Sequence, residues 1–234
     1  NSESNKFIWT YTPPIPSVVI TSTQVNSGDL TNDSSIDVNF LFNENVTFLD
    51  SDINLTSNAT KTSLTGSGNN YNLTLTPTNL DSSASILLSI DENKFYNTFN
   101  SEDFYNDLSY SFYWNHDGII PVPTISTTAV TLDSSLTILT GQTVSFNISF
   151  NKNIDNFIIK NIDSSNAILS SFSGSDMNYS FILVASDPTI DNSINLIIPS
   201  GVITDAAGNV NQVSNEFGFT LNAEVSRILE TSAI

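Results

Sequence analysis

The chain has 234 residues, enough for two domains of ordinary size, and its 39% of hydrophobic residues is sufficient for packed cores. Acidic residues outnumber basic ones 24 to 6; the net charge of −18 argues against nucleic acid, whose phosphates need Lys and Arg clusters, and disfavours an anionic membrane surface. The absence of cysteine excludes disulfides and thiol chemistry, and no apolar run approaches the roughly 18 residues of a membrane span.

The first feature in chain order is an aromatic motif that occurs three times. Phe7-Ile8-Trp9-Thr10 recurs as Phe112-Tyr113-Trp114-Asn115 and as Phe217-Gly218-Phe219-Thr220, each time 105 residues later. We expect this motif to be the last strand of a repeat, with alternate aromatics packed inward. The alternative is an exposed aromatic platform for sugars. Residues 1–12 would then be a stub that matches the last strand of a preceding repeat, and the chain is expected to be a piece of a longer array.

Alternating segments follow at a spacing of 108 residues. In Ile36–Phe42 and Thr143–Phe150, apolar residues occupy every second position, which predicts strands with one face on a core and one in water. Turn signals such as Gly66-Ser67-Gly68-Asn69 separate the segments. The change of spacing requires three extra residues before Val144 and three fewer after Ile198, and such changes belong in loops. Further pairs with this spacing are Gly66 and Gly174, Tyr71 and Tyr179, Leu73 and Phe181, Leu75 and Leu183, Ile86 and Ile194, Leu88 and Leu196, and Ile90 and Ile198.

About seven strands are predicted in each copy. We therefore expect an all-β fold of two tandem immunoglobulin-like β-sandwiches with Greek-key connections. The expected organisation is a stub at 1–12, repeat 1 at 13–117, repeat 2 at 118–222 and an unassigned tail at 223–234.

Several segments resemble the bacterial Ig-like repeats of giant surface adhesins and biofilm-associated proteins. The resemblance implies copies that run head to tail at an extracellular, cell or virion surface, since similar repeats occur in proteins of large viruses and some protists. It also implies a Pro-containing linker after each Phe-x-Trp strand. In repeat 1, residues 100–107 replace the Asp-Ala-Ala-Gly-Asn segment of the family pattern. The segments that carry the resemblance are Gly28-Asp29-Leu30-Thr31-Asn32-Asp33, Phe42-Asn43-Glu44-Asn45-Val46, Leu64-Thr65-Gly66-Ser67-Gly68 and Thr204-Asp205-Ala206-Ala207-Gly208-Asn209.

The inventory of reactive groups argues against catalysis. The single histidine, His116, follows Trp114 and is expected in the linker. With one His and no Cys, a repeated nucleophile–base arrangement cannot be built, and the acidic residues fall mainly in turns. We predict that the chain is not an enzyme.

Calcium is the cofactor that the acidic turns favour, because hard cations bind clustered carboxylates and carbonyls. In an Ig-like topology, two linker-proximal loops of repeat 1 and the loop between the sixth and seventh strands of repeat 2 would meet at the junction. The alternative is that these residues are solvated turn formers. The predicted ligands are Asp29, Asp33, Asp81, Asp117, Asp205 and Asn209.

Seven Asn-x-Ser/Thr sequons could carry glycans in a eukaryotic or viral host. A chain so rich in Asn, Ser and Thr also produces them by accident. The sequon asparagines are Asn32, Asn45, Asn54, Asn58, Asn72, Asn147 and Asn178.

The leading functional hypothesis is a structural or adhesive segment, a stiff spacer whose first partners are the neighbouring repeats of its own chain. Proline fixes φ and stiffens the linkers, which contain Pro13, Pro14, Pro16, Pro121 and Pro123.

Two other functions remain open from the sequence. A carbohydrate-binding module would recognise surface glycans through exposed aromatics, for which Tyr105, Tyr110 and Tyr113 are the candidates. Surface proteins are also possible partners of the chain. A self-assembling filament or virion-surface subunit would pair the strand Phe7–Tyr11 with another subunit.

Overall fold

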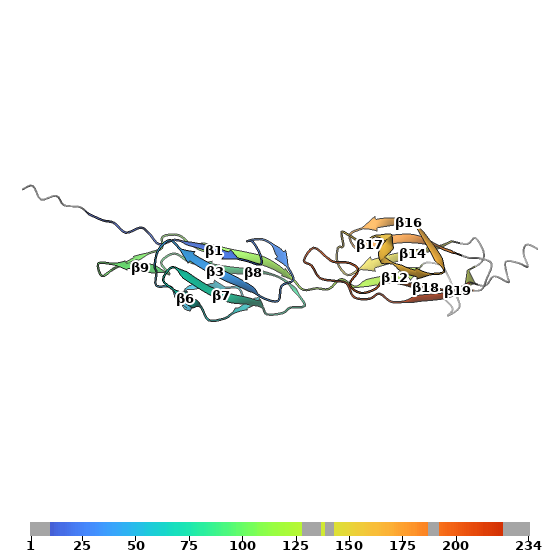
Figure 1. The fold of residues 1–234 in the computed structure, drawn as a ribbon, viewed down its shortest axis with the longest axis horizontal. Helices are drawn as coiled ribbons and strands as arrows, with labels where there is room; N and C mark the ends of the chain where they lie inside the picture. The colour runs from blue at the N-terminus through green and yellow to red at the C-terminus, as the bar shows by residue number, and fades with distance from the viewer. Residues whose placement is uncertain (1–9, 128–136, 139–142, 187–191, 222–234) are drawn as a thin grey trace, which may run out of the picture. The chain divides into compact units, whose positions relative to one another are not determined.

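A computed structural model describes residues 10–127, 137–138, 143–186 and 192–221 (Figure 1). The chain divides between Asp117 and Gly118 into two compact units, called unit 1 and unit 2 below. Each unit consists of two β-sheets that pack face to face around its own core. None of the helices in these described ranges is long and apolar enough to cross a membrane.

Unit 1 contains one sheet of order β1-β3-β7-β5, with β6 also paired to β7, and a second of order β2-β11-β8-β4. Strands β9 and β10 form a separate hairpin between β8 and β11. The bounds are β1 Val18–Ser22, β2 Leu30–Thr31, β3 Ile36–Phe42, β4 Asn54–Leu55, β5 Ala59–Lys61, β6 Thr65–Ser67, β7 Asn70–Pro77, β8 Ser83–Ile90, β9 Tyr96–Phe99, β10 Glu102–Tyr105 and β11 Tyr110–Asp117, with a 3-10 turn η1 at Asp50–Asp52.

Unit 2 repeats this plan, with sheets of order β12-β14-β17-β16 and β13-β19-β18-β15. The bounds are β12 Pro123–Thr127, β13 Thr137–Ile138, β14 Val144–Phe150, β15 Asp163–Ser165, β16 Ala167–Ser175, β17 Asn178–Ala185, β18 Asn192–Ile197 and β19 Phe217–Leu221, with a 3-10 turn η2 at Ile159–Asn161.

The strand order identifies the fold. In unit 1 the first, second, fifth and fourth strands of the sandwich form one sheet, and the seventh, sixth and third form the other. The chain leaves the first sheet after β1 and enters the second at β2, which runs parallel to β11; β13 and β19 make the same parallel pair in unit 2. Both units are therefore immunoglobulin-like β-sandwiches, and the predicted fold class is confirmed.

The cores are built from the alternating residues that the sequence singled out. Phe40 in β3 and Phe146 in β14 are completely buried, while intervening residues of the same strands face outward. The aromatics of the last strands also pack inward, with Trp114 completely buried and Phe219 nearly so. Each such ring contributes on the order of 2–3 kcal/mol through burial, so the core, and not an exposed platform, accounts for these residues.

The position of His116 differs from the prediction. The histidine belongs to β11 and is completely buried, and its Nε2 lies 3.2 Å from the carbonyl oxygen of Leu80. The physical reason is the period of the strand: the inward face that carries Phe112 and Trp114 continues to His116. Of the predicted strand Phe7–Tyr11, residues 7–9 lie outside the described ranges and residues 10 and 11 form no strand. The tail at 223–234 also lies outside the described ranges.

Candidate functional site

The lead-in segments, residues 13–17 of unit 1 and 118–122 of unit 2, are held in the same way. In unit 1, the Asn43 side chain donates to the carbonyl oxygen of Ile15 and accepts from the amide of Ser17, at 3.1 and 2.9 Å. In unit 2, Asn151 makes the equivalent bonds to the Ile120 carbonyl and the Val122 amide, at 3.0 and 2.8 Å. Each unit thus has an asparagine clamp on the chain that enters it.

A second shared asparagine fixes the loop between the sixth and seventh sandwich strands. Asn106 is completely buried, accepts from the amides of Lys94 and Phe95, and donates to the carbonyls of Asp91 and Leu108. All four bonds lie between 2.7 and 3.0 Å. The side chain therefore uses both donors and both acceptor positions of its amide.

Asn211 occupies the matching position in unit 2. It is 2% exposed, accepts from the amides of Val202 and Ile203, and donates to the carbonyls of Pro199 and Gln212. The sequence hypothesis missed this pair, although Asn106 and Asn211 are 105 residues apart, the spacing of the aromatic motif. We refer to these two residues as the loop pins.

Asp205, a predicted calcium ligand, is the centre of a buried hydrogen-bond network. Its Oδ1 accepts from the amides of Ala207 and Asn209, at 2.9 and 2.8 Å. Its Oδ2 accepts from Asn209 Nδ2 at 3.0 Å and from Lys152 Nζ at 2.5 Å. Asp205 and Asn209 therefore do lie together, with the ammonium of Lys152 as the cation beside them.

The charge of Asp205 is stabilised despite burial. Burial alone would raise the pKa of this carboxyl group, but the hydrogen bonds from Lys152 and Asn209 and the positive charge of Lys152 outweigh it, and the pKa lies below its ordinary value. Asp205 is consequently a carboxylate with an internal counterion, and it closes the turn that contains Gly208.

The four remaining predicted calcium ligands are in unit 1. Asp29 Oδ2 accepts from the amide and Nδ2 of Asn26, which closes a local turn. Asp117 is the last residue of β11 and pairs with Ser83, close in sequence to Asp81, while Asp33 follows β2. No group of three or more His, Asp or Glu side chains in the described ranges forms a metal cluster. Calcium binding by the predicted set stays a prediction.

The three candidate tyrosines occupy different environments. Tyr105 is exposed on β10, with its ring centroid 5.0 Å from that of Tyr96. Tyr113 is exposed on β11, and its ring lies over Gly28. Tyr110 is half-buried and tilted against Phe95; burial raises the pKa of its hydroxyl. Tyr105 is therefore an exposed tyrosine with a second aromatic ring beside it, whereas the ring beside Tyr110 belongs to the core.

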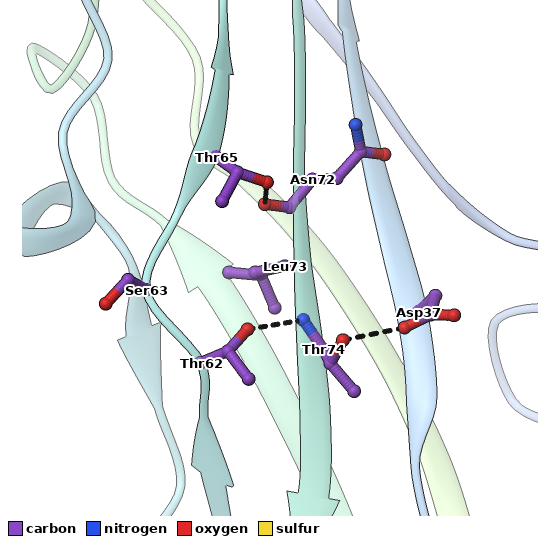
Figure 2. Close-up of a pocket in the computed structure, with 7 residues that line it drawn as sticks. All are labelled: Asp37, Thr62, Ser63, Thr65, Asn72, Leu73 and Thr74. Carbon is purple, nitrogen blue, oxygen red and sulfur yellow. Dashed lines mark hydrogen bonds between the residues drawn. The ribbon is translucent and has the colours of Figure 1, made fainter.

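A hollow of about 580 Å³ lies on the outer face of the first sheet of unit 1 (Figure 2). Thr62 accepts from the amide of Thr74 at 2.9 Å, and the Thr74 hydroxyl donates to Asp37 at 2.7 Å. Figure 2 shows seven lining residues without an aromatic ring, and several of their polar groups bond to one another. The hollow lacks the stacking surface that sugar recognition by aromatics requires.

The seven sequon asparagines are all exposed. Asn72 and Asn147 project from the outer faces of β7 and β14, while Asn54 donates to the carboxylate of Asp91 at 2.9 Å. Exposure permits glycans at these positions, and whether glycans are attached stays a prediction.

Comparison with known proteins gives similarity in structure alone. The sequence matches no protein-family model and no curated protein. Similar solved structures include the titin domains Z1Z2 in complex with telethonin, 11% identical, with 90% of this chain and 97% of that chain covered and a TM-score of 0.28. Another is the I9–I11 tandem from titin, 8% identical, with 87% and 65% covered and a TM-score of 0.26.

Proposed function

We propose that the chain is a non-catalytic structural segment, a stiff spacer made of immunoglobulin-like repeats within a larger surface protein. The observation that carries the proposal is the clamp on each lead-in segment. The last strand of unit 1 ends at Asp117, and the carbonyl of Ile119 already accepts from Lys152 at 2.9 Å. Gly118 is the one residue between Asp117 and Ile119, so little free chain is left for hinge motion.

Two further features support a spacer. The prolines at 13, 16, 121 and 123 are buried in the lead-in segments and first strands, where fixed φ angles limit the conformations of the chain. The net charge of −18 makes neighbouring repeats repel one another and favours an extended array. The resemblance to surface adhesins suggests that such an array projects a binding region. Sequencing the parent reading frame tests that setting, because it should encode further repeats, a secretion signal and an anchor.

Stiffness can be measured with spin labels at Ser111→Cys and Ser145→Cys, two exposed strand positions in a chain that has no other cysteine. Pulsed electron paramagnetic resonance should give a narrow distribution of distances between the two spin labels. Inserting four Gly and Ser residues after Gly118 should broaden it, and Asn151→Ala should broaden it partly. A parent distribution as broad as that of the insertion variant would contradict the proposal.

Recognition of a glycan is a second candidate, favoured by the aromatic character of the β9–β10 hairpin. The Tyr105 ring is tilted against that of Tyr96, and a hollow of about 320 Å³ beside the hairpin is lined in part by Tyr11, Phe99 and Phe104. A glycan array should then give a strong hit that Tyr105→Ala abolishes and Tyr113→Ala keeps. An array without hits would argue against this function.

A further inference from the structure

Among the described residues of unit 1, two side-chain oxygen atoms are buried without a hydrogen-bond partner. They are Oε1 of Glu44 and Oδ1 of Asn97. Asn97 is 7% exposed, so its side chain is more than nine-tenths buried. A buried acceptor left unpaired destabilises the fold, and a buried charge does so more strongly. Each of these two oxygens lacks a donor or cation that would offset its burial.

Unit 2 shows what fills the matching place. Glu44 corresponds to Lys152 at the 108-residue spacing of the repeats. Phe95 and Ile203 donate equivalent amide bonds to the loop pins, so Asn97, two residues after Phe95, matches Asp205, and the loops diverge after this point. Lys152 Nζ lies 2.5 Å from Asp205 Oδ2 and 2.9 Å from the carbonyl oxygen of Ile119. An ammonium thus sits between a side-chain oxygen and a backbone oxygen of the lead-in segment.

The lead-in segment is held in the same way in unit 1. Asn43 and Asn151, the residues before Glu44 and Lys152, clamp their lead-in segments with equivalent bonds. Pro14 corresponds to Ile119, and its carbonyl oxygen accepts from Asn97 Nδ2 at 3.4 Å. In the repeat alignment Glu44 therefore stands at the position of Lys152, one residue after the asparagine that clamps the lead-in segment.

The exchange reverses the local charge. In unit 2, Lys152 and Asp205 together carry no net charge. In unit 1, Glu44 and Asn97 offer oxygen atoms of a carboxylate and an amide, with no basic residue at either position. Such oxygens are the ligands of hard metal cations, which complete their coordination with water.

We propose that unit 1 binds a hard metal cation in the place that the Lys152 ammonium fills in unit 2, with Glu44 Oε1 and Asn97 Oδ1 as protein ligands. The site shares no residue with the predicted calcium set at the junction. A single carboxylate gives a weak site, for which millimolar Ca²⁺ is the suitable probe and Na⁺ the competing monovalent ion.

The test uses the whole chain with Trp9 replaced by Phe, so that the fluorescence comes from Trp114, the buried tryptophan of unit 1; unit 2 contains no tryptophan. Thermal unfolding is followed in CaCl2, in NaCl and in tetramethylammonium chloride with EDTA, all at one ionic strength. A tenfold excess of the bound metal over its Kd should raise the midpoint by about 5 °C. A greater shift in CaCl2 or in NaCl identifies the ion, and equal midpoints in all three salts would overturn the proposal.

Charge-exchange variants decide whether these residues hold the ion. Glu44→Lys with Asn97→Asp installs the unit 2 pair and should abolish the shift while keeping the midpoint high without metal. Glu44→Gln, a milder change, should also abolish it. Asp81→Asn with Asp117→Asn should keep the shift, which separates this site from the predicted junction site. A shift that survives Glu44→Gln in a folded protein would refute the assignment.

Discussion

Single buried polar side chains organise the loops of both units. The loop pins Asn106 and Asn211 each satisfy four backbone groups that the loop between the sixth and seventh strands would otherwise leave unpaired. Around them the two loops differ, because unit 1 has the β9–β10 hairpin and unit 2 has the tight Asp205 turn. The pin therefore tolerates variation in the loop it holds.

Removing a pin should be costly. Asn211→Ala is expected to lower the free energy of unfolding of unit 2 by about 2–4 kcal/mol, because backbone donors and acceptors become buried and unpaired. Asn147→Ala, at an exposed position of β14, should change it by less than about 0.5 kcal/mol. Urea titrations followed by NMR signals of unit 2 provide the measurement. A loss below 1 kcal/mol for Asn211→Ala would show that the pin is dispensable.

Asp205 should make the stability of unit 2 depend on pH. Its folded pKa lies below the unfolded value of about 3.9, so the carboxylate stabilises the fold above about pH 4. That stabilisation is lost as the pH falls from about 4 through the lower folded pKa. Asp205→Asn should therefore be about 2–4 kcal/mol less stable than the parent at pH 7, and the difference should shrink below pH 4.

Urea titrations of unit 2 between pH 2 and pH 7 measure this difference. Asp163→Asn, a change at an exposed strand residue, is the control. Its free energy of unfolding should not differ from that of the parent by an amount that shrinks as the pH falls. A stability difference between Asp205→Asn and the parent that stays constant down to pH 2 would contradict the role of the Asp205 carboxylate.

At the scale of elements, one glycine in each unit permits the hairpin that leads into the fifth sandwich strand. Gly66 and Gly174 have φ of 114° and 133°, in a region that favours glycine. A Cβ at Gly174 would collide with the carbonyl oxygen of Asn178 and lie 2.5 Å from Tyr179 Cα. Steric exclusion of a Cβ therefore explains why both repeats have glycine at this position.

Gly174→Ala should destabilise unit 2 by at least about 2 kcal/mol, because the backbone of β17 must move to make room. Gly218→Ala is the matched control, since Gly218 has no heavy atom within 4 Å of an added Cβ and should change stability by less than about 1 kcal/mol. Denaturant midpoints of the two variants give the comparison, and equal midpoints would show that the hairpin relaxes freely.

Most of the elements could be predicted from the sequence because their signal is local. The alternation in β3 and β14 fixes which residues face the core, and the repeat spacing places the strands that follow. The pairs β2–β11 and β13–β19 were not predictable, because two-residue strands carry no periodicity. The prediction placed His116 in the linker because its side chain is polar. Its position on the inward face of β11 follows instead from the two-residue period of the strand.

The candidate site was predictable in part for a similar reason. The turn containing Asp205 and Asn209 was identified, since acidic and amide residues mark turns. Its partner Lys152 is 53 residues away, and such ion pairs depend on tertiary contacts that a single sequence does not reveal. The contrast between Glu44 and Lys152 appears in the repeat alignment, but its meaning depends on the burial of Asn97.

At the scale of the whole molecule, the two units have separate hydrophobic cores. The buried apolar residues of one core lie between Val18 and Trp114, and those of the other between Ile125 and Phe219. Each sandwich has a complete core of its own and can fold without its neighbours. A spacer made of such units therefore becomes longer with each added copy.

Separate cores predict separate unfolding. Phe181 is 1% exposed in unit 2, and Phe181→Ala should cost that unit about 3–5 kcal/mol through lost burial and a cavity. The unit 1 transition, followed by Trp114 fluorescence, should keep its urea midpoint, whereas NMR signals of unit 2 should be lost at lower urea. The reverse variant, Phe40→Ala, should shift the Trp114 transition and leave unit 2 unchanged. If either variant shifts both transitions together, the two units unfold as one cooperative body and do not fold independently. The loss of stability in one core would then also destabilise the other.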